Sequence, residues 1–109
     1  MLPLATELLQ AFAVSDLETI ERLCADDVLL VGTDENEYWE GLEAVLASFG
    51  GVYDLRVEWV GEPQVSDRWV FGRAVFIEED GSELPVRVTM IFEGEELVHG
   101  HYSVMREVT

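Results

Sequence analysis

The hydrophobic pattern of this chain changes its period once, near Gly50-Gly51. Before that point apolar side chains recur every three or four residues, which predicts amphipathic helices. After it they alternate with polar side chains, which predicts strands. One short apolar run, Val28–Val31, predicts a buried strand inside the helical half. The predicted helices span residues 3–13, 15–25 and 42–49, and the later strands span residues 53–60, 68–78, 86–93 and 96–106. We therefore expect an α+β fold, with three helices packed on a mainly antiparallel sheet.

Local signals set several boundaries in this pattern. Ser15 and Glu18 have the spacing of a capping box, which predicts that the second helix begins at Ser15. Asp80-Gly81 is a favoured pair for a two-residue hairpin turn, and Gly94-Glu95 is interpreted as the next turn. The stretch 32–41, between the first strand and the third helix, is expected to be a loop.

The two predicted turns fix a strand register. Val75 is then expected opposite Val86, and Val88 opposite His101; paired residues share a face. With this register both faces of the sheet are largely apolar, and three helices can cover only one of them. A second subunit is therefore expected on the outer face, with Arg87 in the contact, as a symmetric homodimer.

Charge narrows the range of partners. The chain has 109 residues, of which 23 are acidic and six are arginines, and it has no lysine, so its formal net charge is −17. A surface of this sign repels nucleic acids and anionic membranes, and neither is expected as a partner. The same charge suggests, as a hypothesis about habitat, a cytoplasm of high salt concentration.

Location and redox chemistry follow from two simple features. No apolar run exceeds four residues, which is too short for a membrane span, and the N-terminal residues lack the basic region of a signal peptide. A cytoplasmic location is therefore expected. The single cysteine, Cys24, is interpreted as a small buried hydrophobic residue, because no base lies near it in the sequence.

Four short segments together resemble the SnoaL-like branch of the nuclear transport factor 2-like proteins. They are Ser15–Glu18, Leu23–Val28, Tyr38–Ala44 and Val98–Ser103. The resemblance implies one SnoaL-like domain over residues 1–109, folded as a cystatin-like cone of three helices on a curved sheet. Members of this superfamily include isomerases, dehydratases, cyclases and small-ligand-binding dimers, so the resemblance implies the fold more strongly than any one activity.

Ketosteroid isomerase, an enzyme of that superfamily, needs a carboxylate base and two neutral hydrogen-bond donors in an apolar pocket. Aligned on Ala25–Asp27, the resemblance places the base at Gly32, and the donors near Leu8 and at Val88. None of these residues has the required side chain. The steroid isomerase reaction is therefore not expected.

Two histidines and one carboxylate are the candidate catalytic residues. His99 and His101 are two positions apart, so they share one face of the last predicted strand. With Asp34, His101 could form an acid–base pair of the dehydratase or cyclase kind. The alternative is that both histidines are core or interface side chains. Two histidines without a further ligand do not indicate a metal site, and no metal or cofactor is expected.

Aromatic residues and one arginine are the candidate ligand contacts. Tyr38, Trp39 and Trp59 could form an aromatic mouth to the cone. Arg73 shares the predicted face of the two histidines and needs an acidic partner or an anionic ligand. The predicted ligand-binding residues are Trp39, Tyr38, Arg73, His99 and Trp59.

Three functional hypotheses follow from these residues. The first is a dimeric SnoaL-like protein that binds a small, largely apolar ligand, with one polar or anionic group, in its cone. The second is an acid–base lyase, isomerase or cyclase that uses His101 with Asp34. The third is a purely structural dimerisation module. Whether the protein is an enzyme is left open by the sequence.

Overall fold

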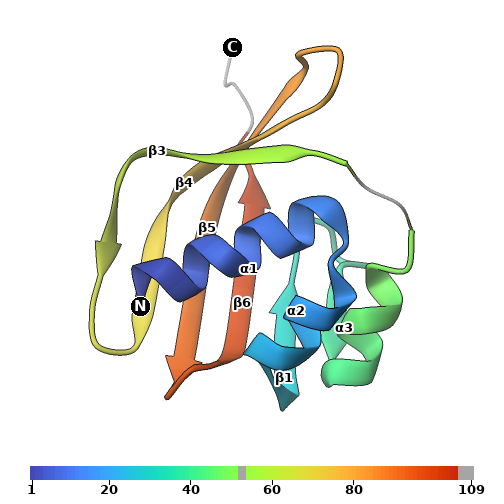
Figure 1. The fold of residues 1–109 in the computed structure, drawn as a ribbon, viewed down its shortest axis with the longest axis vertical. Coiled ribbons are helices and arrows are strands. Elements are labelled where there is room, and N and C mark those ends of the chain that lie inside the picture. Colours follow the sequence, from blue (N-terminus) through green and yellow to red (C-terminus); the bar gives the residue numbers. More distant parts are fainter. Residues whose placement is uncertain (52–53, 106–109) are drawn as a thin grey trace.

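The computed structural model describes residues 1–51 and 54–105. Within them the chain forms three helices and six strands (Figure 1). In chain order they are α1 (Leu2–Val14), α2 (Leu17–Leu23), β1 (Cys24–Val31), β2 (Tyr38–Glu40), α3 (Leu42–Ser48), β3 (Arg56–Val65), β4 (Trp69–Ile77), β5 (Glu83–Glu93) and β6 (Glu96–Val104).

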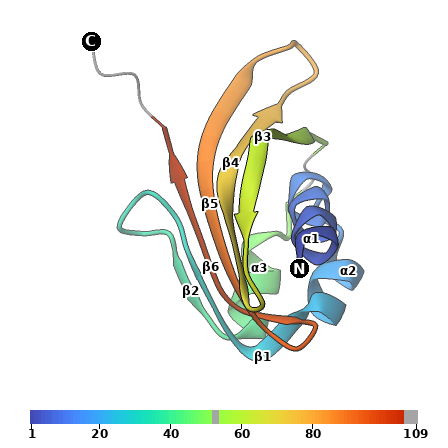
Figure 2. The ribbon, with the colours of Figure 1, turned by 90° about the vertical axis from the view of Figure 1, so that its left-hand side faces the viewer.

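The strands form one mixed sheet in the order β2-β1-β6-β5-β4-β3. Every neighbouring pair is antiparallel except β1 and β6, which are parallel. The sheet is curved, and the helices lie on one side of it, as Figure 2 shows from the edge. This arrangement confirms the predicted α+β cone of three helices on a mainly antiparallel sheet.

The core lies between the helices and the inner face of the sheet. Leu8 of α1 and Val70 and Ala74 of β4 are fully buried in it. Burial of this apolar surface is the main stabilising contribution to the fold. A hydrogen bond also links β3 to α1: the indole Nε1–H of Trp59 donates to Thr6 Oγ1 at 2.9 Å.

The start of α2 differs from the prediction. Ser15 is not the N-cap; it ends α1 in a left-handed conformation, with a φ of 53°. Asp16 is the N-cap, and its carboxylate accepts hydrogen bonds from the Thr19 N–H at 3.2 Å and from Thr19 Oγ1 at 2.6 Å. An aspartate caps a helix as well as a serine does, so the pattern alone allowed either residue.

The turn between β4 and β5 is one residue longer than predicted. Glu78 N–H donates to the Ser82 carbonyl at 2.9 Å, which leaves residues 79–81 as a three-residue loop. Gly81 has a φ of +88°, as expected for the left-handed residue of such a loop. Val75 therefore pairs with Pro85 and not with Val86, and the predicted register was wrong by one residue.

The turn between β5 and β6 was predicted correctly, but a bulge follows it. Glu93 pairs with Glu96 across Gly94-Glu95, whereas Ile91 pairs with His99, which leaves one extra residue in β6. Val88 is consequently opposite Tyr102 and not His101. A bulge inserts one residue into one strand without a strong sequence signal, so it was not predicted.

The longer turn before β5 and the bulge in β6 change which residues of neighbouring strands share a face of the sheet. Arg73 and Arg87 lie directly opposite each other and share a face, although they were predicted on opposite faces. Val88 and Met90 are buried and belong to the inner face, with Val70 and Ala74. Arg87 lies on the outer face as predicted, but Arg73, which was expected on the cavity face, lies there beside it.

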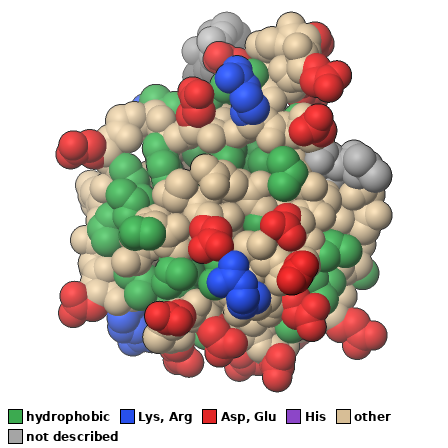
Figure 3. All heavy atoms as spheres, viewed as in Figure 1, with side chains coloured by type: hydrophobic (Ala, Val, Ile, Leu, Met, Phe, Trp, Pro, Cys, Tyr) green, Lys and Arg blue, Asp and Glu red, His purple; other side chains and the backbone are tan. Residues whose placement is uncertain are grey.

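Surface charge follows the composition. The face that carries the helices shows many acidic side chains and few basic ones (Figure 3). Within residues 1–51 and 54–105 the one ion pair joins Arg22 to Glu7 at 2.8 Å, and both side chains are exposed. In the same part of the chain no helix is long and apolar enough to cross a membrane.

Candidate functional site

A cavity of about 310 Å³ lies between α1, α3 and the inner face of the sheet. This volume is at the lower end of the range for small-molecule sites. Most of its wall is apolar. It is lined by Leu9, Phe12, Leu30, Glu37, Trp39, Ser48, Phe49, Leu55, Phe76, Leu84, Val88, Thr89, Met90, Gly100, His101 and Tyr102.

Aromatic rings form much of the wall. Phe12 at the end of α1 stacks on Phe49, which follows α3, with ring centroids 4.8 Å apart and planes at 13°. Trp39 comes from β2, where its partner Leu30 in β1 is also a lining residue. This part of the cavity wall is therefore built from the C-terminal ends of α1 and α3 and from the strands β1 and β2 at the edge of the sheet.

A carboxylate and a phenol form the main polar feature of the wall. Tyr102 of β6 donates a hydrogen bond of 2.6 Å from its hydroxyl to Glu37 Oε2. The other oxygen of Glu37, Oε1, accepts from the Asp34 N–H at 2.9 Å. Glu37 N–H in turn donates to the Asp34 carbonyl at 2.9 Å, which closes the loop before β2. The carboxylate is thus held from both of its oxygens.

Gly32 makes this contact geometrically feasible. A Cβ at position 32 would lie 2.6 Å from Glu37 Cβ and 2.7 Å from Tyr102 Oη, closer than side-chain atoms approach. Gly32 N–H also donates to the Glu37 carbonyl. Glu37 and Tyr102 therefore occupy the space that a side chain at position 32 would need.

The hydrogen bonds change the acidity of Glu37. The hydroxyl of Tyr102, followed by the backbone N–H groups of Asp34 and Thr33, holds the pKa of Glu37 below its ordinary value of 4.5, and partial burial opposes this effect. Donors that favour the charged form of a carboxylate lower its pKa. Glu37 is therefore ionised at neutral pH.

Of the residues predicted from the sequence, Trp39 borders the cavity. His101 touches it only from the strand β6, because it is exposed and pairs with Thr89, which puts its side chain on the outer face with that of His99. Asp34 is exposed in the loop before β2, and its backbone, not its carboxylate, bonds to Glu37. Within the described part of the chain no hydrogen bond joins Asp34 to His101. Their roles as an acid–base pair stay a prediction.

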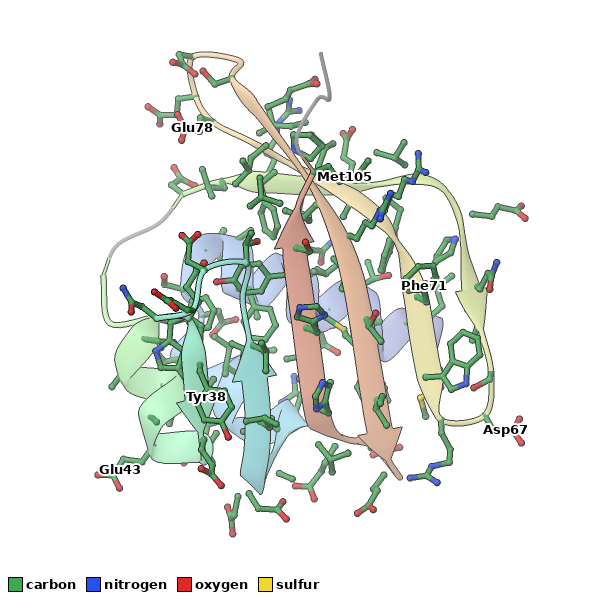
Figure 4. All side chains as sticks on the ribbon, turned by 180° about the vertical axis from the view of Figure 1, so that it is seen from behind. Tyr38, Glu43, Asp67, Phe71, Glu78 and Met105 are labelled. Carbon is green, nitrogen blue, oxygen red and sulfur yellow. The ribbon has the colours of Figure 1, made fainter. Side chains whose placement is uncertain are left out.

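The remaining candidates lie away from the cavity wall. Tyr38 alternates with Trp39 and is 55% exposed on the outer face of the sheet (Figure 4). Arg73 is exposed beside Arg87 on the same outer face, and half-buried His99 is paired with Ile91 there. Trp59 faces α1 through its bond to Thr6. The face that was expected to line the cavity is thus the outer face, because α1 covers the alternate residues of β4.

Sequence reasoning missed Glu37 and Tyr102. Glu37 stands in the acidic run 34–37, which looks like a solvated turn. Tyr102 was assigned to the outer face, because the face of His99, His101 and Arg73 was expected to line the cavity, whereas the helices cover the other face. The alternation of Tyr102 with His101 and the small residue Gly32 were the available signals, but they identify the pair only when the face that α1 covers is known.

Cys24 and the acidic groups do not add a second site. Cys24 is 2% exposed, and burial, with the charge of Glu96, raises its thiol pKa to about 12. The interpretation of Cys24 as a buried hydrophobic residue is confirmed. Within the described residues no three His, Cys, Asp or Glu side chains are grouped so as to hold a metal ion.

Comparison with known proteins identifies relatives at the level of sequence family and of fold. The family model of the SnoaL-like domain matches residues 2–107. No curated protein sequence matches this chain significantly.

Three solved structures illustrate the likeness in fold. A protein from Sphaerobacter thermophilus has a TM-score of 0.78 at 14% identity, over 95% of this chain and 94% of that one. A candidate isomerase of the SnoaL-like family from Agrobacterium tumefaciens has a TM-score of 0.77 at 16% identity, over 96% and 97%. A hypothetical protein with a ketosteroid isomerase-like fold from Catenulispora acidiphila, in complex with trimethylamine, has a TM-score of 0.73 at 15% identity, over 91% and 82%.

Proposed function

The chain belongs to the family of SnoaL-like domains, and on that premise we propose that it binds a small, largely apolar molecule in the cavity between its helices and its sheet. The observation that carries the proposal is the cavity itself, about 310 Å³ in volume and lined mostly by apolar and aromatic side chains. A cavity with a few fixed polar groups is the usual form of a small-molecule site. The complex of the Catenulispora acidiphila protein with trimethylamine supports the idea that a protein of this fold accepts small molecules.

Native mass spectrometry of the purified protein, followed by denaturation of the same sample, tests for a retained ligand. A small mass that is released on unfolding supports the proposal. The second measurement is a titration with cyclohexanol, a neutral and largely apolar probe, followed by the NMR signals of Trp39 and Met90, which line the cavity. Absence of both a retained mass and a saturable shift would sink the proposal.

A matched pair of variants locates the binding. Ser48 lines the cavity, whereas its neighbour Ala47 on α3 is exposed and does not. Ser48→Phe should fill part of the cavity and weaken cyclohexanol binding at least about tenfold. Ala47→Phe adds the same side chain outside the cavity and should leave the binding unchanged. Equal effects of the two variants would place the probe elsewhere.

An acid–base enzyme is the second candidate function. The cavity wall holds two side chains that can exchange protons, Glu37 and Tyr102. His101 is exposed and pairs with Thr89, so its imidazole lies on the outer face of the sheet. The candidate isomerase from Agrobacterium tumefaciens has a related fold and favours this alternative. The pair of His101 with Asp34 belongs to the same proposal. Loss of turnover in a His101→Gln variant that keeps cyclohexanol affinity would support a catalytic role; undiminished turnover would exclude one for His101.

We also propose that the protein is a homodimer that contacts its partner through the outer face of the sheet. Large apolar side chains are exposed on that face, where Phe71 is 42%, Trp69 39% and Tyr38 55% exposed. Figure 4 looks onto this face. Exposed aromatic residues on one sheet face are typical of protein interfaces. None of the helices in residues 1–51 and 54–105 covers this side of the sheet (Figure 2), so a second copy of the chain is the occupant proposed.

A further inference from the structure

The carboxylate of Glu37 is held in a fixed position at the wall of the cavity. Tyr102 Oη donates to its Oε2 at 2.6 Å, and the Asp34 N–H donates to its Oε1 at 2.9 Å. Gly32 leaves the room that this arrangement needs. Because the donors come from β6 and from the loop before β2, the position of the charge is set by the fold and not by the rotamer of one exposed side chain.

The charge of Glu37 has no cationic partner among the described residues. The ion pair within them, Arg22–Glu7, lies on the exposed surface of α1 and α2. Arg73 and Arg87 are on the outer face of the sheet, and no arginine is among the described residues that line the cavity. With a formal net charge of −17 on the chain, the field in the cavity favours positive groups.

The rest of the wall also suits a cation with apolar substituents. Trp39, Tyr102 and the stacked pair Phe12 and Phe49 present aromatic rings to the cavity. Aromatic faces attract organic cations, and rings grouped around a site bind quaternary ammonium groups. An anion would meet the Glu37 carboxylate, and the described lining residues offer it no compensating arginine, so a polar group on the ligand is expected to be positive.

We propose that the molecule bound in this cavity is a small organic cation, a protonated or quaternary amine whose apolar substituents contact the aromatic wall and whose charge faces Glu37. This inference rests on the proposed ligand-binding function and specifies the chemical class of the ligand. It differs from the expectation from the sequence, in which the ligand carried one polar or anionic group and Arg73 had either an acidic partner in the protein or an anionic ligand.

Choline and its neutral carbon isostere, in which carbon replaces the quaternary nitrogen, form the matched pair of probes. Their affinities are measured by titration of the Trp39 indole signal. We expect choline to bind at least about tenfold more tightly than the isostere at low salt. Added salt should weaken choline binding and leave binding of the isostere unchanged.

Two variants test whether Glu37 is the residue that causes the tighter binding of choline. Glu37→Gln keeps an acceptor for Tyr102 and removes the charge, so choline should bind no more tightly than the isostere. Glu35→Gln removes the same charge from an exposed neighbour that does not line the cavity, and the preference should persist. Unchanged affinity of the isostere in Glu37→Gln shows that the cavity is intact.

The outcomes separate this inference from the proposed function. Equal affinities of the two probes for the unmodified protein would overturn the cationic ligand and leave the binding cavity standing. A preference for choline that survives Glu37→Gln would also overturn the inference. Binding of neither probe, together with no binding of cyclohexanol, would overturn both proposals.

Discussion

Tyr102 Oη and Glu37 Oε2 lie 2.6 Å apart, although 65 positions separate the two residues in the sequence. The bond joins the last strand of the sheet to the loop before β2. It depends on Gly32, where any side chain would collide with both partners. This one hydrogen bond therefore joins β6 to the loop before β2 and fixes the charged carboxylate of Glu37 at the wall of the cavity.

Tyr102→Phe should reduce the free energy of unfolding by about 1 kcal/mol at neutral pH, because a hydrogen bond to a charged group is lost at a half-buried site. The pKa of Glu37 is lowered in the folded protein, so the stabilisation is present above its ordinary value of 4.5 and is lost as the pH falls through the lower folded value. The difference between the two proteins should therefore shrink on acidification. Urea unfolding over a pH series measures it, and a difference that grows at acidic pH would contradict the assigned bond.

Gly32→Ala should disrupt the same contact by steric means. The added Cβ would lie 2.6 Å from Glu37 Cβ and 2.7 Å from Tyr102 Oη, so one of them must move. We expect a loss of about 1–3 kcal/mol in unfolding free energy. At Gly50 the nearest contact of an added Cβ would be 3.3 Å, so Gly50→Ala is the milder control. Comparable losses in the two variants, measured by thermal unfolding, would argue against the close packing at Gly32.

Much of the fold was predictable, because long hydrophobic periods report burial on one side of a helix or strand. The expected helix over residues 3–13 corresponds to α1, and the expected strand over residues 68–78 corresponds to β4. The faces of the sheet were less predictable. One extra turn residue before Ser82 and one bulge in β6 each moved the register by one position, and such a shift reverses the face of a strand.

The candidate site was predictable only in part. Trp39 borders the cavity as expected, because a large aromatic residue in a predicted loop beside acidic residues indicated a ligand contact. Glu37 was not identified, since an acidic residue among other acidic residues gives no local signal of its partner. Its role comes from a residue 65 positions away, and a sequence pattern within one loop contains no information on that distance.

Ser15→Gly should stabilise the protein, whereas Asp16→Ala should destabilise it. Ser15 has a positive φ, and its Oγ is buried without a hydrogen-bond partner, so glycine relieves both costs, by about 0.5–1 kcal/mol. Asp16→Ala removes the cap of α2 and should cost about 1 kcal/mol. Chemical denaturation of both variants checks the assignment. If Ser15 were the N-cap, as the capping-box pattern predicted, the two effects would be exchanged.

Phe71→Glu should convert the proposed homodimer into a monomer. Phe71 is 42% exposed on the outer face of β4, next to the edge strand β3, and a buried, unpaired carboxylate there would oppose association. Val14→Glu places the same charge on the helical side at a residue that is 47% exposed, and the dimer should persist. Sedimentation velocity gives the mass of each species. A monomeric unmodified protein at all accessible concentrations would exclude the dimer outright.

Salt should stabilise this protein. A formal net charge of −17 on 109 residues produces strong self-repulsion in the compact state, and the described residues contain one exposed ion pair to offset it. Raising NaCl to about 1 M shortens the screening length to about 3 Å. We expect the unfolding free energy to rise by about 1 kcal/mol or more, which is about 4–8 °C in Tm for a domain of this size.

The double variant Glu78→Gln, Glu79→Gln, at the exposed tip between β4 and β5, should be more stable than the unmodified protein at low salt and should gain less from added NaCl. Equal stability at low and high salt in both proteins would mean that repulsion is already balanced in the folded state, and the high-salt habitat would lose its physical support.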